Sequence, residues 1–117
     1  MAIAAARAAD AKKGEDIVVL DIGDLMVVTD FFIVVTASNR VLMKTVAEEI
    51  EDRLSDMGVK PIGREGRANG GWLLIDFGSV VCHVFDPEAR DFYRLEKLWG
   101  NAGRVDWEAD EAVEQGA

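Results

Sequence analysis

Half of the 117 residues are hydrophobic, and the chain is long enough for one domain with a full core but too short for two. Its formal net charge of −9 gives little electrostatic drive toward nucleic acid, so a partner attracted by charge should be basic. No apolar run approaches the roughly 20 residues that span a bilayer, which argues against a membrane protein.

The first half of the chain alternates helix and strand patterns. Residues 1–13 are rich in alanine and favour a short helix, and the apolar runs at 17–20 and 31–35 predict two strands. Ser38 or Asn39 can cap a following helix that reaches about Met57. Its apolar residues recur at helical spacing and form one stripe: Met43, Val46, Ala47, Ile50, Leu54 and Met57. This pattern predicts a helix that covers one face of a sheet.

Residues 59–71 give weaker signals. Residues 59–62 predict a short strand, at an edge or bulged because Pro61 lacks a backbone donor. Residues 63–71 are rich in glycine and predict a connecting loop. A strand follows this loop, whereas a phosphate site would need a helix N-terminus there, so phosphate binding is disfavoured.

Residues 72–85 give the strongest pattern, two apolar runs on either side of a turn at residues 76–79. Gly78 suits a positive φ and Asp76 can cap the turn, which predicts a hairpin. Both runs are apolar on both faces, so the hairpin should lie inside a covered sheet. Asp86 and Pro87 then favour the start of a helix over residues 88–99, which Gly100 ends. The whole pattern predicts an α/β domain.

The predicted last helix has an apolar side and polar sides. Helical spacing places Phe92, Leu95 and Trp99 together, and we predict that they face the core. Two other sides are polar: Arg90, Arg94 and Lys97 share one, and Tyr93, Glu96 and Lys97 share another. A solvated face is the ordinary explanation of such a row, but Tyr and Arg also concentrate binding energy at interfaces.

Residue types that carry chemistry are sparse. Cys82 and His83 could be a nucleophile and a base, but neighbours in a strand point to opposite faces and cannot form such a pair. Asp21, Asp24 and Asp30 have no ligand-loop spacing for a metal, and one His with one Cys gives no zinc set. The single cysteine allows no internal disulfide and suits a reducing cytoplasm.

We place the domain at residues 1–103 and an acidic tail at residues 104–117. The tail contains five acidic residues and one arginine, and its larger apolar residues are Val105, Trp107 and Val113. Such a segment can bury little surface, so we expect a flexible tail that the fold does not need. Docking of Trp107 is the alternative.

Several motifs together resemble the ribosomal silencing factor family, also called RsfS or Iojap, over residues 14–100. The motifs are Thr-Asp-Phe-Phe-Ile-Val at 29–34, Glu-Gly at 65–66, Trp-Leu-Leu-Ile-Asp-Phe-Gly at 72–78, Val-Cys-His-Val-Phe at 81–85, and Arg-Asp-Phe-Tyr-Arg-Leu-Glu-Lys-Leu-Trp at 90–99. Each motif alone is unspecific, but the combination is specific. Cys82 stands where the family more often has valine, which fits a packing role for its thiol.

The resemblance implies a mixed sheet of about five strands covered by helices, similar to nucleotidyltransferases. It also implies a translational repressor, often a homodimer when free, with no catalysis and no cofactor. Such proteins bind ribosomal protein fourteen of the large subunit and block joining of the small subunit. The contact residues carried over at motif positions are Glu65, Trp72, Arg90, Tyr93, Glu96 and Lys97. Whether Trp72 is a core residue or an interface residue stays open.

Two other functions stay open from the residues. A degenerate nucleotidyltransferase or nucleotide-binding protein could use Asp21, Asp24 or Asp76. In such enzymes, paired carboxylates that hold magnesium come directly after a Gly-Ser turn. Here Gly78-Ser79 is followed by two valines and Cys82. A homodimeric adaptor unrelated to ribosomes is the third possibility.

Overall fold

A computed structural model describes residues 1–23, 29–100 and 102–109. One mixed sheet has the strand order β3-β4-β5-β2-β1-β6, in which β2 and β5 are parallel and all other neighbours antiparallel. The elements are α1 (Ala2–Ala11), β1 (Glu15–Asp21), β2 (Phe31–Thr36), α2 (Arg40–Asp56), β3 (Gly63–Arg67), the 3₁₀ turn η1 (Ala68–Gly70), β4 (Trp72–Asp76), β5 (Val80–Phe85), α3 (Pro87–Tyr93), α4 (Leu95–Leu98) and β6 (Gly103–Arg104). The predicted mixed α/β domain is confirmed, with one strand more than expected. Among the described residues, no helix is long and apolar enough to cross a membrane.

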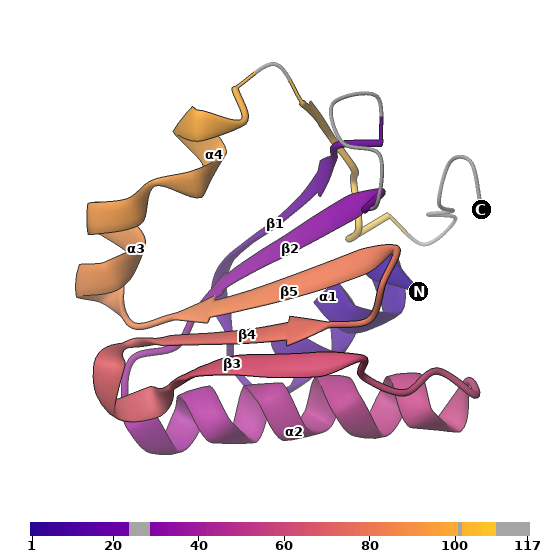
Figure 1. Cartoon of the computed structure of the whole chain (residues 1–117). Coiled ribbons are helices and arrows are strands. Elements are labelled where there is room, and N and C mark those ends of the chain that lie inside the picture. Colours follow the sequence, from indigo (N-terminus) through magenta and orange to yellow (C-terminus); the bar gives the residue numbers. More distant parts are fainter. Residues whose placement is uncertain (24–28, 101, 110–117) are drawn as a thin grey trace.

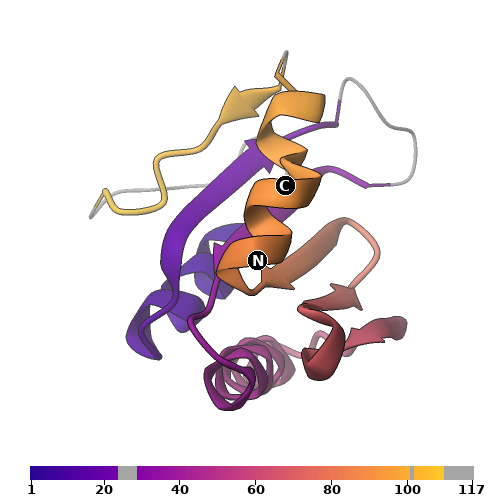
Figure 2. The same cartoon turned by 90° about the vertical axis from the view of Figure 1, so that its left-hand side faces the viewer.

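Helices lie on both faces of the sheet. Helices α1 and α2 cover one face, and α3 and α4 stand end to end against the other (Figures 1 and 2). Alternation along β2 sends Ile33 and Val35 to the core under α1 and α2, and sends Phe32 and Val34 to the opposite side. Every residue of β2 and β5 is buried. Strands that are apolar on both faces therefore occupy the covered centre of the sheet, as predicted.

Helix α2 and the hairpin form as their sequences predict. The Asn39 side chain accepts a hydrogen bond from the Leu42 amide, and the apolar stripe of α2 is buried, except for a partly buried Ala47 and an exposed Met57 at the end. In the turn between β4 and β5, the Asp76 carboxylate accepts from the Gly78 amide at 2.7 Å, and Gly78 has φ +90°. Asp86 caps α3 by accepting from the Ala89 amide.

The strand predicted near residues 59–71 lies further along the chain than expected. No strand forms at 59–62, and the glycine-rich segment that we expected to be a loop contains β3, which pairs with β4 from Gly63 opposite Asp76 to Arg67 opposite Trp72. Gly66 lies at φ +83°, and a Cβ there would overlap the Trp72 carbonyl. The glycine thus permits close approach of two strands at a distorted edge, a use that composition does not distinguish from a loop.

The predicted last helix is two helices. Arg94 adopts the left-handed conformation (φ 47°, ψ 53°) and separates α3 from α4. The break interrupts the helical spacing, so Phe92 is 78% exposed and its predicted place in the core is wrong. Leu95 and Trp99 do pack against the sheet, as expected.

Residues 104–109 differ from the expected flexible tail. Strand β6 pairs with β1, with Gly103 opposite Asp21 and Arg104 opposite Leu20, so the expected boundary falls inside a strand. Trp107 packs against the larger core, and its Nε1 donates to the Ile17 carbonyl at 3.1 Å. The Arg7 guanidinium on α1 donates to the carbonyls of Trp107 and Ala109. The rest of the expected tail, residues 110–117, lies outside the described residues.

Candidate partner-binding site

Three of the six predicted contact residues come together in one depression. A cavity of about 340 Å³ is lined by Glu65, Gly66, Arg67, Gly70, Trp72, Leu74 and Tyr93, and we call it the aromatic groove. Strand β3 supplies Glu65, β4 supplies Trp72, and the end of α3 supplies Tyr93. The groove therefore exists only because β3 pairs with β4 and α3 folds back over the sheet.

Trp72 is neither a core residue nor a free surface residue. Its ring centroid lies 4.6 Å from that of Tyr93 and 5.1 Å from that of Phe85, while one side remains open to the groove. Its Nε1 donates a hydrogen bond to His83 Nδ1 at 3.2 Å. Tyr93 is 44% exposed and lies on the outer side of this stack. The two rings thus form a supported apolar wall that faces solvent.

The other three predicted residues lie elsewhere. Arg90, Glu96 and Lys97 line a larger polar cleft of about 710 Å³ between β1 and the two last helices. The expected grouping of Tyr93 with Glu96 and Lys97 on one helix side is therefore wrong, because the break at Arg94 sends them toward different cavities.

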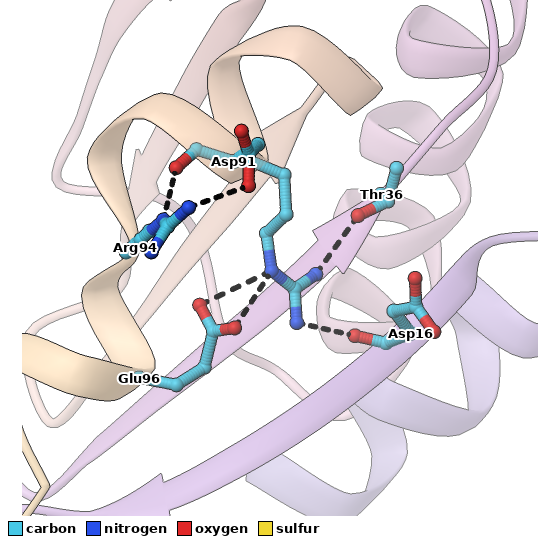
Figure 3. Close-up of polar contacts among 6 residues, drawn as sticks. Asp16, Thr36, Asp91, Arg94 and Glu96 are labelled. Atoms are coloured by element: carbon cyan, nitrogen blue, oxygen red, sulfur yellow. Dashed lines mark hydrogen bonds and ion pairs between the residues drawn. The ribbon is translucent and has the colours of Figure 1, made fainter.

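Arg90 connects parts of the protein and does not extend into solvent. Its side chain is 11% exposed, and its Nε donates to both carboxylate oxygens of Glu96 at 3.1 and 3.2 Å. The remaining nitrogens donate to Thr36 Oγ1 at 2.9 Å and to the Asp16 carbonyl at 2.7 Å (Figure 3). These contacts join α3, α4, β2 and the start of β1. Arg90 therefore links the last two helices to the sheet, and its charge is paired with that of Glu96.

Cys82 and His83 point to opposite faces of the sheet, as predicted. Cys82 packs in the core under α1 and α2, where burial raises the pKa of its thiol and keeps it protonated. His83 lies on the other face between Phe32 and Trp72, and burial lowers its pKa to about 4. The two side chains cannot act together on one substrate.

The buried neutral histidine predicts a pH dependence of stability. Between pH 6.5 and about 4 the unfolded chain binds a proton at His83 that the folded chain does not, so the folded state loses stability as pH falls through this window. The loss should reach about 3 kcal/mol near pH 4. His83 is the only histidine. Urea titrations of the parent and His83→Leu from pH 7 to 4 should therefore diverge, with the parent losing more; parallel curves would show that His83 is charged or exposed in the folded protein.

Of the aspartates considered for metal binding, Asp21 and Asp30 lie near each other, because a Cβ at Gly23 would come within 3.6 Å of Asp21 Oδ1 and 3.3 Å of Asp30 Oδ1. Asp76, which was considered for nucleotide chemistry, does not join them. Asp21 ends β1 and Asp76 ends β4, with β5 and β2 between these strands. Three strand spacings separate the two backbones by about 14 Å, too far for one ion. Asp24 lies outside the described residues, and within the described part of the chain no three potential ligands cluster. The degenerate nucleotidyltransferase alternative gains no support from this arrangement.

Sequence reasoning missed several lining residues of the groove. Leu74 lies within the hairpin motif, but its side was not assigned, and Arg67 and Gly70 belonged to the expected loop. Alternation from Trp72 would have placed Leu74 on the same face. Nothing in the sequence indicates that the backbone of Arg94 is left-handed, so the separation of Tyr93 from Glu96 could not be predicted.

The chain is a small α/β domain whose aromatic groove presents Trp72 and Tyr93 toward solvent. The model of the family described as "Ribosomal silencing factor during starvation" matches residues 1–117, and the chain belongs to this family. It is 38% identical to the ribosomal silencing factor RsfS of Bacillus subtilis over 102 residues, which cover 87% of this chain and 86% of that protein. It is 35% identical to the chloroplastic protein Iojap of Zea mays over 108 residues, 90% of this chain but 46% of that longer protein.

Solved structures agree with the fold. A crystal structure of a Chromobacterium violaceum protein superposes with a TM-score of 0.79 at 38% identity and covers 83% of this chain and 81% of its own. A second, from Bacillus halodurans, has a TM-score of 0.74 at 33% identity and covers 87% and 92%. The resemblance noted in the sequence is thereby confirmed, and the family is named for a regulator rather than for a catalyst.

Proposed function

We propose that this protein represses translation by binding the large ribosomal subunit through ribosomal protein fourteen and blocking the joining of the small subunit. Membership of the ribosomal silencing factor family supports a ribosomal role. The finer mechanism rests on the aromatic groove, where a half-exposed Tyr93 backed by Trp72 has the composition of an interface hot spot. The repressor acts in the cytoplasm, excludes the small subunit sterically, and needs no cofactor.

The net charge of the chain fits a basic protein partner, and the groove itself is lined by one acid and one base, Glu65 and Arg67. Glu65 lies at its rim on an exposed edge strand, and Phe92 extends the apolar surface beside Tyr93, at a ring distance of 5.0 Å. The chain carries a net charge of −9, which opposes binding to bare RNA and favours a cationic protein surface. Glu65, Trp72 and Tyr93 therefore form the proposed central contact, and Lys97 contributes at a second margin on α4. We also propose that the free protein is a homodimer.

Loss of the Tyr93 ring is expected to weaken subunit binding strongly. A hot-spot tyrosine commonly contributes about 2 kcal/mol or more, so Tyr93→Ala should bind purified large subunits about thirtyfold more weakly. The measurement is co-sedimentation with large subunits in a sucrose gradient, together with an assay of subunit joining. Met57→Ala is the matched control, because Met57 is also exposed but ends α2 on the opposite face.

Three results would contradict the proposal. If the parent sediments with the small subunit alone, or with neither subunit, the ribosomal target is wrong. If the parent binds large subunits but leaves subunit joining unchanged, steric exclusion is wrong. If Tyr93→Ala binds like the parent while melting at the same temperature, the partner uses another surface.

A further inference from the structure

His83 is a buried polar residue on the face of the sheet that carries the groove. It is 5% exposed and stands in the middle of β5, where the backbone pairs hold it opposite Leu74 on one side and Val34 on the other. Its ring centroid lies 4.8 Å from that of Phe32, edge to face, and 6.1 Å from that of Phe85, nearly parallel. Strand pairing and two aromatic neighbours thus fix both the place and the plane of the imidazole.

The hydrogen bond from Trp72 determines the state of that imidazole. Because Trp72 Nε1 can only donate, His83 Nδ1 must be an unprotonated acceptor, and the proton of the neutral ring is on Nε2. Among the residues that the structure describes, none hydrogen-bonds His83 Nε2. A buried polar atom without a partner costs stability, so folding alone would favour an apolar side chain of similar size here.

We propose that His83 is a positioning residue for partner binding: its Nδ1 holds the Trp72 indole against Tyr93 and so sets the shape of the aromatic groove. The inference rests on the proposed function, because the groove is taken as the partner site. An indole N–H at a half-buried position needs an acceptor, and without one the ring would turn to reach water. Turning would separate the Trp72 and Tyr93 rings, which now lie 4.6 Å apart and form the wall of the groove.

Two substitutions separate the acceptor from the packing. His83→Leu fills the same space without an acceptor, whereas the amide oxygen of His83→Asn can stand where Nδ1 stands. We expect His83→Leu to melt at or above the temperature of the parent, yet to bind purified ribosomal protein fourteen about tenfold more weakly. His83→Asn should recover most of that affinity. If His83 had a purely structural role, His83→Leu could not lose affinity for the partner while keeping its melting temperature.

Indole NMR reads the position of Trp72 directly and does not depend on a partner. In His83→Leu the Trp72 indole N–H should shift and exchange faster with solvent, and its contacts with the Tyr93 ring should disappear. The Trp107 indole, which donates to Ile17 O, is an internal control that should not change. If the Trp72 signal and its Tyr93 contacts are the same in His83→Leu and the parent, the positioning role is wrong whatever binds.

A double-mutant cycle completes the test. In a Trp72→Phe background there is no indole N–H, so His83→Leu should cause no further loss of affinity. An equal loss in both backgrounds would show that His83 acts by another route and would overturn the inference. If Tyr93→Ala binds like the parent, the proposed binding site fails, and the NMR comparison still decides whether His83 positions the indole.

Discussion

A chain that ends at Gly103 is expected to be less stable than the full chain by about 3 to 5 kcal/mol, the usual cost of removing a packed tryptophan. Trp107 contacts the larger core and bonds the Ile17 carbonyl, while the Val105 amide donates to the Val19 carbonyl beside β6. Truncation removes these contacts and leaves the outer edge of β1 unpaired. Urea titration of the two chains measures the difference.

A chain that ends at Ala109 is the matched control. It loses most of the acidic residues of the segment but keeps Trp107 and the two carbonyls that Arg7 binds. We expect its stability to lie within about 0.5 kcal/mol of the full chain. Trp107→Ala should reproduce most of the loss caused by ending at Gly103. Equal stability of all these chains would mean that the segment after β6 is not docked in solution.

The C-terminal segment shows where sequence reasoning ends. Its composition is acidic with few apolar residues, which led us to expect a flexible tail. Its docking depends on one tryptophan that meets a carbonyl 90 positions earlier in the chain, and on a strand of only two residues. Periodicity and propensity act over a few neighbours and contain no information about such a contact.

The sheet was more predictable than the site. Runs such as Phe31–Thr36 and the turn at Asp76 and Gly78 specify their structure locally, because burial on two faces and turn chemistry leave few alternatives. The groove depends instead on Gly66, where a positive φ lets β3 approach β4, and on Arg94, a left-handed residue without the glycine that usually marks one. Motif positions singled out Glu65, Trp72 and Tyr93, and their contact with a partner stays a prediction. That these three line one groove, apart from Arg90, Glu96 and Lys97, could not be foreseen.

Arg90→Ala is expected to destabilise the protein by about 3 kcal/mol, because breaking a largely buried ion pair leaves its partner groups unsatisfied. The substitution leaves the Glu96 carboxylate, Thr36 Oγ1 and the Asp16 carbonyl without their shared donor. Asp16 has φ 48° in the irregular start of β1, and the arginine ties this backbone to the last helices. Arg90→Lys should recover little, since one ammonium cannot replace the guanidinium fork.

Arg94→Ala is the matched control for this prediction. Arg94 also pairs with an acid, but its side chain is 52% exposed and that of Asp91 is 79% exposed, so the pair should contribute less than about 1 kcal/mol. Urea titrations of both variants give the comparison. A loss at Arg90 no larger than at Arg94 would show that α3 and α4 are held by their apolar contacts alone. A large loss at Arg90 with a small one at Arg94 would establish that the most buried cation of the motif serves the fold.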